Sequence, residues 1–138
     1  MKEKKRILLV DDDPDFVEIN RMILEAAEYE VDAADSVARA LQMLNEADYD
    51  VLVIDLMMEE RDSGFTLTYA VRNDERLRHL PILMLTSAQE KTGFSFQFSE
   101  DKEWMKVDDF ASKPLKPADL VARIGRLITK GVAHDPEP

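Results

Sequence analysis

Three short apolar runs, each bounded by charged residues, proline or threonine, constrain the fold of this chain more than any other feature. They are Ile7–Val10, Val51–Ile54 and Ile82–Leu85. A run of four apolar residues without alternation is typical of a strand buried on both faces, as strands of a parallel sheet are. Two weaker strands are predicted at Glu30–Ala34 and Asp109–Ser112. We therefore expect five strands.

Apolar residues at helical spacing separate these strands. Asp13 is a predicted N-cap with Pro14 at the first helical position, and Ser36 is predicted to cap a second helix. A third helix is predicted at Gly64–Asn73, and Pro117 opens the last. The apolar positions that define the four helices are Phe16, Ile19, Ile23 and Ala27, then Val37, Ala40, Leu41 and Leu44, then Phe65, Leu67 and Val71, then Leu120, Val121, Ile124, Leu127 and Ile128. Strands that alternate with helices predict one doubly wound α/β domain with helices on both faces of a parallel sheet.

The domain is predicted to span residues 1–130. Gly131 is a helix stop signal, and residues 131–138 are polar and contain proline, so we expect a disordered tail there. One internal segment also breaks the pattern, because residues 86–108 lack clean helical periodicity and Phe94, Phe96 and Phe98 alternate with polar residues. We expect an irregular fourth helix region, which either covers the edge of the core or binds a partner.

Composition narrows the class of protein. The 138 residues are 45% hydrophobic and 34% charged, as in a soluble globular domain. No apolar run approaches the roughly 20 residues that span a bilayer, and no signal peptide is evident, so we expect a cytoplasmic protein without membrane insertion. The net charge of -11 argues against direct nucleic-acid binding. The absence of cysteine excludes disulfides and thiolate metal sites.

Polar residues with shared chemistry follow the predicted strands. Asp11 and Asp12 follow the first strand, Asp55 the third, Thr86 the fourth and Lys113 the fifth. In open α/β sheets, ligands bind beyond the carboxyl ends of the strands. Three acids, a hydroxyl and a lysine are therefore predicted to share one crevice.

This set of residues indicates phosphoryl chemistry. Clustered carboxylates repel one another, and a divalent cation that prefers oxygen ligands, Mg2+ or Mn2+, relieves the repulsion. A carboxylate beside such a metal can attack a phosphoryl group, while a lysine neutralises the phosphoryl oxygens. Each residue alone has a structural interpretation: Asp13 is a helix cap, Asp55 a turn residue and Lys113 an extended residue before proline. The signal lies in the combination.

Four segments in order resemble the receiver-domain family of two-component response regulators. They are Ile7–Pro14, Val53–Met58, Pro81–Ala88 and Phe110–Leu115, and the resemblance runs from about Arg6 to Leu127. It implies a flavodoxin-like fold with strand order 2-1-3-4-5 and a stand-alone receiver acting in a phosphorelay.

The resemblance also implies a metal site. Asp12 would be a direct ligand of Mg2+, and Asp11 would act directly or through water. Asp55 would be both a metal ligand and the phospho-acceptor. The backbone carbonyl of Met57 would complete the protein's share of the metal shell.

A phosphoryl site and a switch are implied beside that metal. Thr86 and Lys113 would bind the phosphoryl group, and Phe110 would move as Thr86 shifts. The Lys113–Pro114 peptide is expected to be cis. The donor would be a phosphohistidine on a sensor histidine kinase or phosphotransfer protein, and the output an unknown downstream protein. The chain would be no enzyme beyond its own phosphorylation and dephosphorylation.

Two departures from the family pattern keep alternatives open. Glu59 stands where the family usually has proline, which makes the loop after Asp55 more acidic, and residues 89–108 lack the family's regular fourth helix. A second hypothesis is therefore a degenerate receiver that binds partners without phosphorylation. A third is a metal-dependent phosphohydrolase of another α/β family, since Asp11 and Asp13 form an Asp-x-Asp pattern after the first strand.

Overall fold

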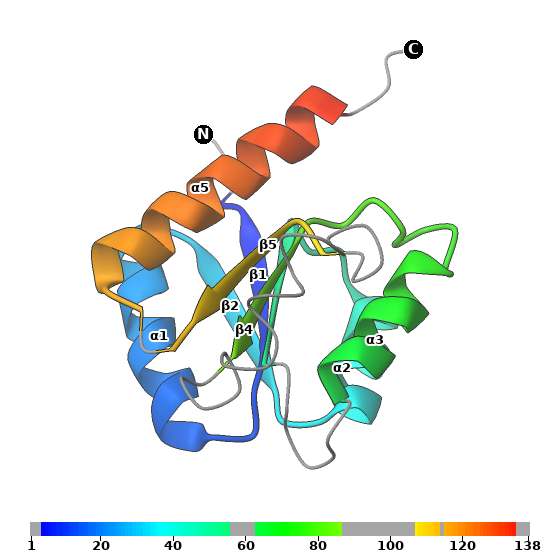
Figure 1. The fold of residues 1–138 in the computed structure, drawn as a ribbon, viewed down its shortest axis with the longest axis horizontal. Coiled ribbons are helices and arrows are strands. Elements are labelled where there is room, and N and C mark those ends of the chain that lie inside the picture. The colour runs from blue at the N-terminus through cyan, green and yellow to red at the C-terminus, as the bar shows by residue number, and fades with distance from the viewer. Residues whose placement is uncertain (1–3, 56–62, 87–106, 114, 135–138) are drawn as a thin grey trace.

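The computed structural model describes residues 4–55, 63–86, 107–113 and 115–134. They contain one sheet of five parallel strands in the order β2-β1-β3-β4-β5 (Figure 1). The strands are β1 (Arg6–Val10), β2 (Glu30–Ala34), β3 (Val51–Asp55), β4 (Ile82–Thr86) and β5 (Asp109–Ser112). The predicted sheet and strand order are confirmed, while the expected irregular fourth helix region lies outside the described residues.

Four helices lie in the described part of the chain and cover both faces of the sheet (Figure 1). They are α1 (Pro14–Ala26), α2 (Val37–Glu46), α3 (Ser63–Arg72) and α5 (Pro117–His134). α1 and α5 pack on one face, and α2 and α3 on the other. None of these helices is long and apolar enough to cross a bilayer.

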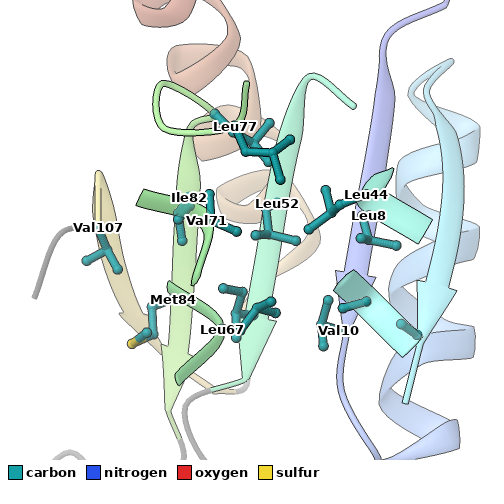
Figure 2. Packing of buried hydrophobic residues seen from close by; sticks show 14 residues of the cluster. Leu8, Val10, Leu44, Leu52, Leu67, Val71, Leu77, Ile82, Met84 and Val107 are labelled. Atoms are coloured by element: carbon teal, nitrogen blue, oxygen red, sulfur yellow. The ribbon is translucent and has the colours of Figure 1, made fainter. Parts of the chain in front are cut away.

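Each strand supplies both cores, because successive side chains of a strand point to opposite faces. Leu8 and Val10 enter the core beneath α2 and α3, whereas Ile7 and Leu9 enter the core beneath α1 and α5. Figure 2 shows the first of these cores, with members from several elements: Leu8, Val10, Leu44, Leu52, Leu67, Val71, Leu77, Ile82, Met84 and Val107. Burial on both faces explains why the three central strands have unbroken apolar sequences.

The two predicted N-caps are confirmed. The carboxylate of Asp13 accepts hydrogen bonds from the backbone N–H groups of Asp15 and Phe16, at 3.0 and 3.4 Å. Ser36 Oγ accepts one from the N–H of Arg39 at 3.1 Å. These bonds satisfy N–H groups that have no partner within their own helix, and they determine where the two helices begin.

The apolar positions that define α1 in the sequence do not all lie on its buried face. Ile19 is 58% exposed, whereas Asn20 and Leu24 are buried. The buried face of α1 is thus rotated about the helix axis toward Asn20, a polar residue that the apolar pattern does not include. Burial of Asn20 is tolerated because its side-chain amide donates a 2.7 Å hydrogen bond to the carbonyl oxygen of Phe16.

The predicted helix stop at Gly131 was also wrong, because α5 continues to His134. A glycine inside a helix costs about 1 kcal/mol relative to alanine, so it weakens a helix without forcing an end. Glycine ends a helix by adopting positive φ, and no glycine in the described residues does so. The domain boundary at residues 130 and 131 remains a prediction, and the helix crosses it.

One arginine ties β5 to the rest of the sheet. The Arg72 guanidinium donates hydrogen bonds to the carbonyl oxygens of Arg78 and Leu80, at 3.0 and 2.7 Å, and to Asp108 Oδ2 at 2.9 Å. The same Asp108 oxygen accepts the backbone N–H of Ile82 at 2.8 Å. The amino ends of β4 and β5 are therefore held together, which fixes where their opposite ends lie.

Candidate functional site

Five predicted site residues lie at one edge of the sheet. Asp11 and Asp12 follow β1, Asp55 ends β3, Thr86 ends β4 and Lys113 follows β5. We call this edge the carboxyl edge, because the parallel strands all end there. β1 and β3 are neighbours with Val10 opposite Ile54, so the next residues, Asp11 and Asp55, extend toward the same point.

Three of these residues form an acidic cluster. One carboxylate oxygen from each of Asp11, Asp12 and Asp55 lies within 4.8 Å of the others. Asp11 and Asp55 are only 4% and 6% exposed, while Asp12 is exposed. Carboxylates buried this deeply need compensation by hydrogen bonds or by positive charge. The predicted grouping of the three acids is confirmed.

One carboxylate oxygen of Asp11 is held by a hydrogen bond, and the other faces the acidic cluster. Its Oδ1 accepts the backbone N–H of Asp13 at 2.9 Å. Its Oδ2 is buried and has no hydrogen-bond partner of good geometry in the described part of the chain. The Lys113 ammonium lies 2.8 Å from that oxygen, which is a close ion pair. Asp11 therefore points a ligand atom into the cluster.

Lys113 supplies the positive charge of the site. Its Nζ lies 2.8 Å from Asp11 Oδ2 and 3.6 Å from Asp55 Oδ2. Burial by itself lowers the pKa of Lys113, but the carboxylates of Asp11 and Asp55 outweigh burial and raise the pKa above its ordinary value. Its backbone N–H donates a 2.6 Å hydrogen bond to the carbonyl oxygen of Thr86, so the lysine is anchored to the end of β4.

The residues of the cluster fit a hard divalent cation. Three carboxylates and one ammonium carry a net charge of about -2 at neutral pH, which a dication offsets. All the candidate ligand atoms are oxygens, and the exposed Asp12 leaves room for water, as Mg2+ and Mn2+ require. Asp11 Oδ2, which faces the cluster and contacts the Lys113 ammonium at 2.8 Å, is placed to serve as a ligand atom for such an ion.

The two predicted switch residues lie on the neighbouring strands β4 and β5. Thr86 is fully buried and pairs in register with Ser112. Phe110 pairs with Met84 and is half-buried against the core beneath α2 and α3. Thr86 ends β4 at the carboxyl edge, whereas Phe110 lies two residues before the end of β5.

Several predictions fall outside the described residues. They concern the carbonyl of Met57, the acidic loop with Glu59, the peptide bond to Pro114 and the aromatic segment around Phe94, Phe96 and Phe98.

The sequence did not indicate that Phe16 belongs to the site. The Lys113 ammonium lies 4.2 Å from the centroid of the Phe16 ring. The apolar pattern identifies Phe16 only as one of the positions that define its helix. A signal was nevertheless present, since Phe16 lies in the first turn of the helix that starts directly after the acids.

Asp13 takes no part in the acidic cluster. Its carboxylate caps α1, so the Asp-x-Asp pattern does not bring two acids together. This geometry removes the main support for the phosphohydrolase interpretation.

Sequence comparisons with known proteins all indicate the same family. The family profile "Response regulator receiver domain" matches residues 7–125. The transcriptional regulatory protein GltR of Pseudomonas aeruginosa is 31% identical over 126 residues, which are 91% of this chain and 50% of GltR. The sensor histidine kinase TmoS of Ectopseudomonas mendocina is 33% identical over 133 residues, which are 96% of this chain and 13% of TmoS.

Comparison of the fold with solved structures indicates the same family. A putative response regulator from Chloroflexus aurantiacus superposes with a TM-score of 0.80 at 31% identity, covering 92% of this chain and 99% of that one. This chain spans half of GltR and a smaller part of TmoS. The region matched by the family profile, residues 7–125, contains every residue of the acidic cluster together with Lys113. The chain therefore belongs to the response-regulator receiver-domain family.

Proposed function

We propose that this receiver domain accepts a phosphoryl group on Asp55 in a Mg2+-dependent reaction and then signals through contacts with another protein. The acidic cluster carries this proposal: three carboxylates meet within 4.8 Å, and Lys113 Nζ lies 3.6 Å from Asp55. Receiver domains are signalling modules that histidine kinases phosphorylate. The donor proposed here is accordingly a phosphohistidine of a sensor kinase or phosphotransfer protein.

Asp55 acts as the nucleophile in the proposed reaction. One carboxylate oxygen forms a P–O bond as the P–N bond of the donor breaks, and the imidazole nitrogen keeps the electron pair of that bond. Asp55 is suited to this role because it ends a strand that is buried along its whole length, so its backbone is held firmly. Lys113 follows β5, the strand next to β4, and its ammonium neutralises charge on the transferred oxygens.

Asp11, Asp12 and Asp55 would hold the Mg2+ ion. When bound, the ion neutralises the carboxylates and the phosphoryl oxygens, which otherwise repel one another. Asp12 is the exposed member of the cluster, so it lies on the side from which a donor approaches. Asp11 contributes the buried oxygen that has no well-directed hydrogen bond.

Thr86 and Phe110 transmit the change in the proposed switch. The Thr86 hydroxyl hydrogen-bonds the phosphoryl group, and movement of Thr86 alters the space open to the Phe110 ring on the adjacent strand. Phosphorylation thus favours one of two arrangements of these side chains, and a downstream protein binds one arrangement better than the other.

Mass spectrometry of the intact protein tests the proposal. The protein is incubated with Mg2+ and phosphoramidate, a small donor that has a P–N bond. We expect a single phosphoryl adduct that EDTA prevents and that Asp55→Asn removes. Asp48→Asn is the matched control, because Asp48 is an acid with a 96% exposed side chain and no place in the cluster, and it should label like the unsubstituted protein.

Two results would contradict the proposal. An adduct that persists in Asp55→Asn would place the acceptor elsewhere. The lack of any adduct on folded protein with Mg2+ would favour the alternative function, a receiver that binds partners without phosphorylation.

A further inference from the structure

We propose that Phe16 is a positioning residue for Lys113, and that its ring holds the lysine on Asp11 in competition with the metal. The inference rests on the proposed function, since it assigns a role to a residue beside the same acidic cluster. It begins from the 4.2 Å between the Lys113 ammonium and the centroid of the Phe16 ring.

The Lys113 ammonium sits at the meeting point of three groups. Asp11 Oδ2 is 2.8 Å away, Asp55 Oδ2 is 3.6 Å away, and the Phe16 ring lies on a further side. The side chain of Lys113 is only 18% exposed. Little water therefore separates the ammonium from the ring, and the attraction between a cation and an aromatic face is stronger when water is excluded.

Phe16 is itself held firmly. Its backbone N–H donates to the capping carboxylate of Asp13, and its carbonyl oxygen accepts the side-chain amide of the buried Asn20. Its ring also packs against the core beneath α1 and α5. The two hydrogen bonds hold the backbone of Phe16 and core packing holds its ring, so Phe16 can restrict a lysine whose long side chain would otherwise adopt many rotamers.

The competition with the metal follows from the atom that the lysine contacts. Asp11 Oδ1 already accepts the N–H of Asp13, so Oδ2 is the oxygen of Asp11 that can serve as a metal ligand, and the Lys113 ammonium lies 2.8 Å from it. Metal binding to that oxygen requires the ammonium to move away from it. Any group that favours the resting position of the lysine therefore weakens metal binding, and Phe16 is such a group.

Mg2+ titration of the full chain by calorimetry at constant ionic strength tests this role. Phe16→Leu removes the aromatic face, and we expect it to tighten Mg2+ binding by at least about two- to fivefold, the effect of a cation–π contact at an exposed site. Phe16→Tyr keeps an aromatic face and should bind Mg2+ like the unsubstituted protein. Lys113→Met removes the competing ammonium and should bind Mg2+ more tightly than either.

The double variant Phe16→Leu with Lys113→Met separates positioning from structure. If the ring acts through the lysine, Phe16→Leu has no further effect on Mg2+ affinity once the ammonium is gone. The same change with and without the ammonium would overturn the inference, as would no change in Phe16→Leu alone. Phe16→Met, which also lacks a ring, replaces Phe16→Leu if circular dichroism shows that the latter is unfolded.

The outcomes also separate this inference from the proposed function. An unsubstituted protein that binds no Mg2+ would overturn both. Normal Mg2+ binding and phosphorylation, without the dependence on Phe16, would overturn the positioning role alone.

Discussion

Tyr49 shows at the level of a single residue how burial and a hydrogen bond act together. Its hydroxyl donates a 2.7 Å hydrogen bond to Asp32 Oδ2, and Arg6 lies over its ring. Burial, followed by the bond to Asp32 and the charge of Asp32, raises the pKa of Tyr49 to about 12, although Arg6 acts in the opposite direction. The folded protein thus holds the phenol proton more tightly than the unfolded chain does.

The sign of this shift gives a prediction of pH dependence. The contribution of Tyr49 to stability is fully present below pH 10 and is lost as the pH rises toward about 12. The difference in unfolding free energy between the protein and Tyr49→Phe should therefore shrink over that interval. Urea unfolding at several pH values measures it, and absorbance at 295 nm follows the phenol. If the absorbance of Tyr49→Phe shows the same ionisation near pH 12 as that of the unsubstituted protein, the bond to Asp32 does not persist in solution.

Individual site residues were predictable where their position follows from the end of a strand. Asp11, Asp55 and Lys113 each come directly at the end of a strand, and parallel strands end at one edge, so their meeting needs no knowledge of side-chain direction. The contact of Phe16 with Lys113 was not predictable in this way. It depends on how a helix is rotated against the sheet, and the same rotation placed Ile19 in solvent and Asn20 in the core.

The three consecutive acids that precede helix α1 have two different roles. Asp13 caps the helix, whereas Asp11 and Asp12 belong to the acidic cluster. Asp13→Ala should lower the free energy of unfolding by about 1 kcal/mol, because two N–H groups lose their acceptor, while Mg2+ binding persists. Ser36→Ala, the equivalent change at α2, should have a similar cost, whereas Asp12→Asn should weaken Mg2+ binding.

Urea unfolding measures the free energy of unfolding of these three variants, and Mg2+ titration measures their affinity for the ion. Loss of Mg2+ binding in Asp13→Ala with the helix intact would make Asp13 a ligand, and the phosphohydrolase interpretation would return.

The elements were predictable to the extent that local signals set their ends. Asp13, Ser36 and Pro117 mark helix starts that the structure confirms, because a cap or a proline acts through the nearest few backbone groups. The end of α5 was missed, since Gly131 carries only a weak local cost. The link from Arg72 to Asp108 was also beyond sequence reasoning, because it joins residues 36 positions apart.

At the scale of the whole molecule, the two cores make the acidic edge possible. Five strands with apolar residues on both faces form a rigid sheet, and this sheet holds Asp11 and Asp55 buried at its edge. The same arrangement concentrates negative charge in a chain whose net charge is already -11. The fold thus keeps together carboxylates that repel one another, so its stability depends on what neutralises them.

This dependence predicts that Mg2+ stabilises the whole fold. A ligand that binds only the folded state adds stability that grows with concentration, about 2.7 kcal/mol at one hundred times the dissociation constant. Urea unfolding in EDTA and in increasing Mg2+ measures the increment, with NaCl at matched ionic strength as the control for screening of the net negative charge. Asp12→Asn should lose most of the increment and be more stable than the unsubstituted protein in EDTA, because one of three clustered charges is gone. Equal stabilisation by NaCl would mean that general screening, and not a site at the carboxyl edge, relieves the repulsion.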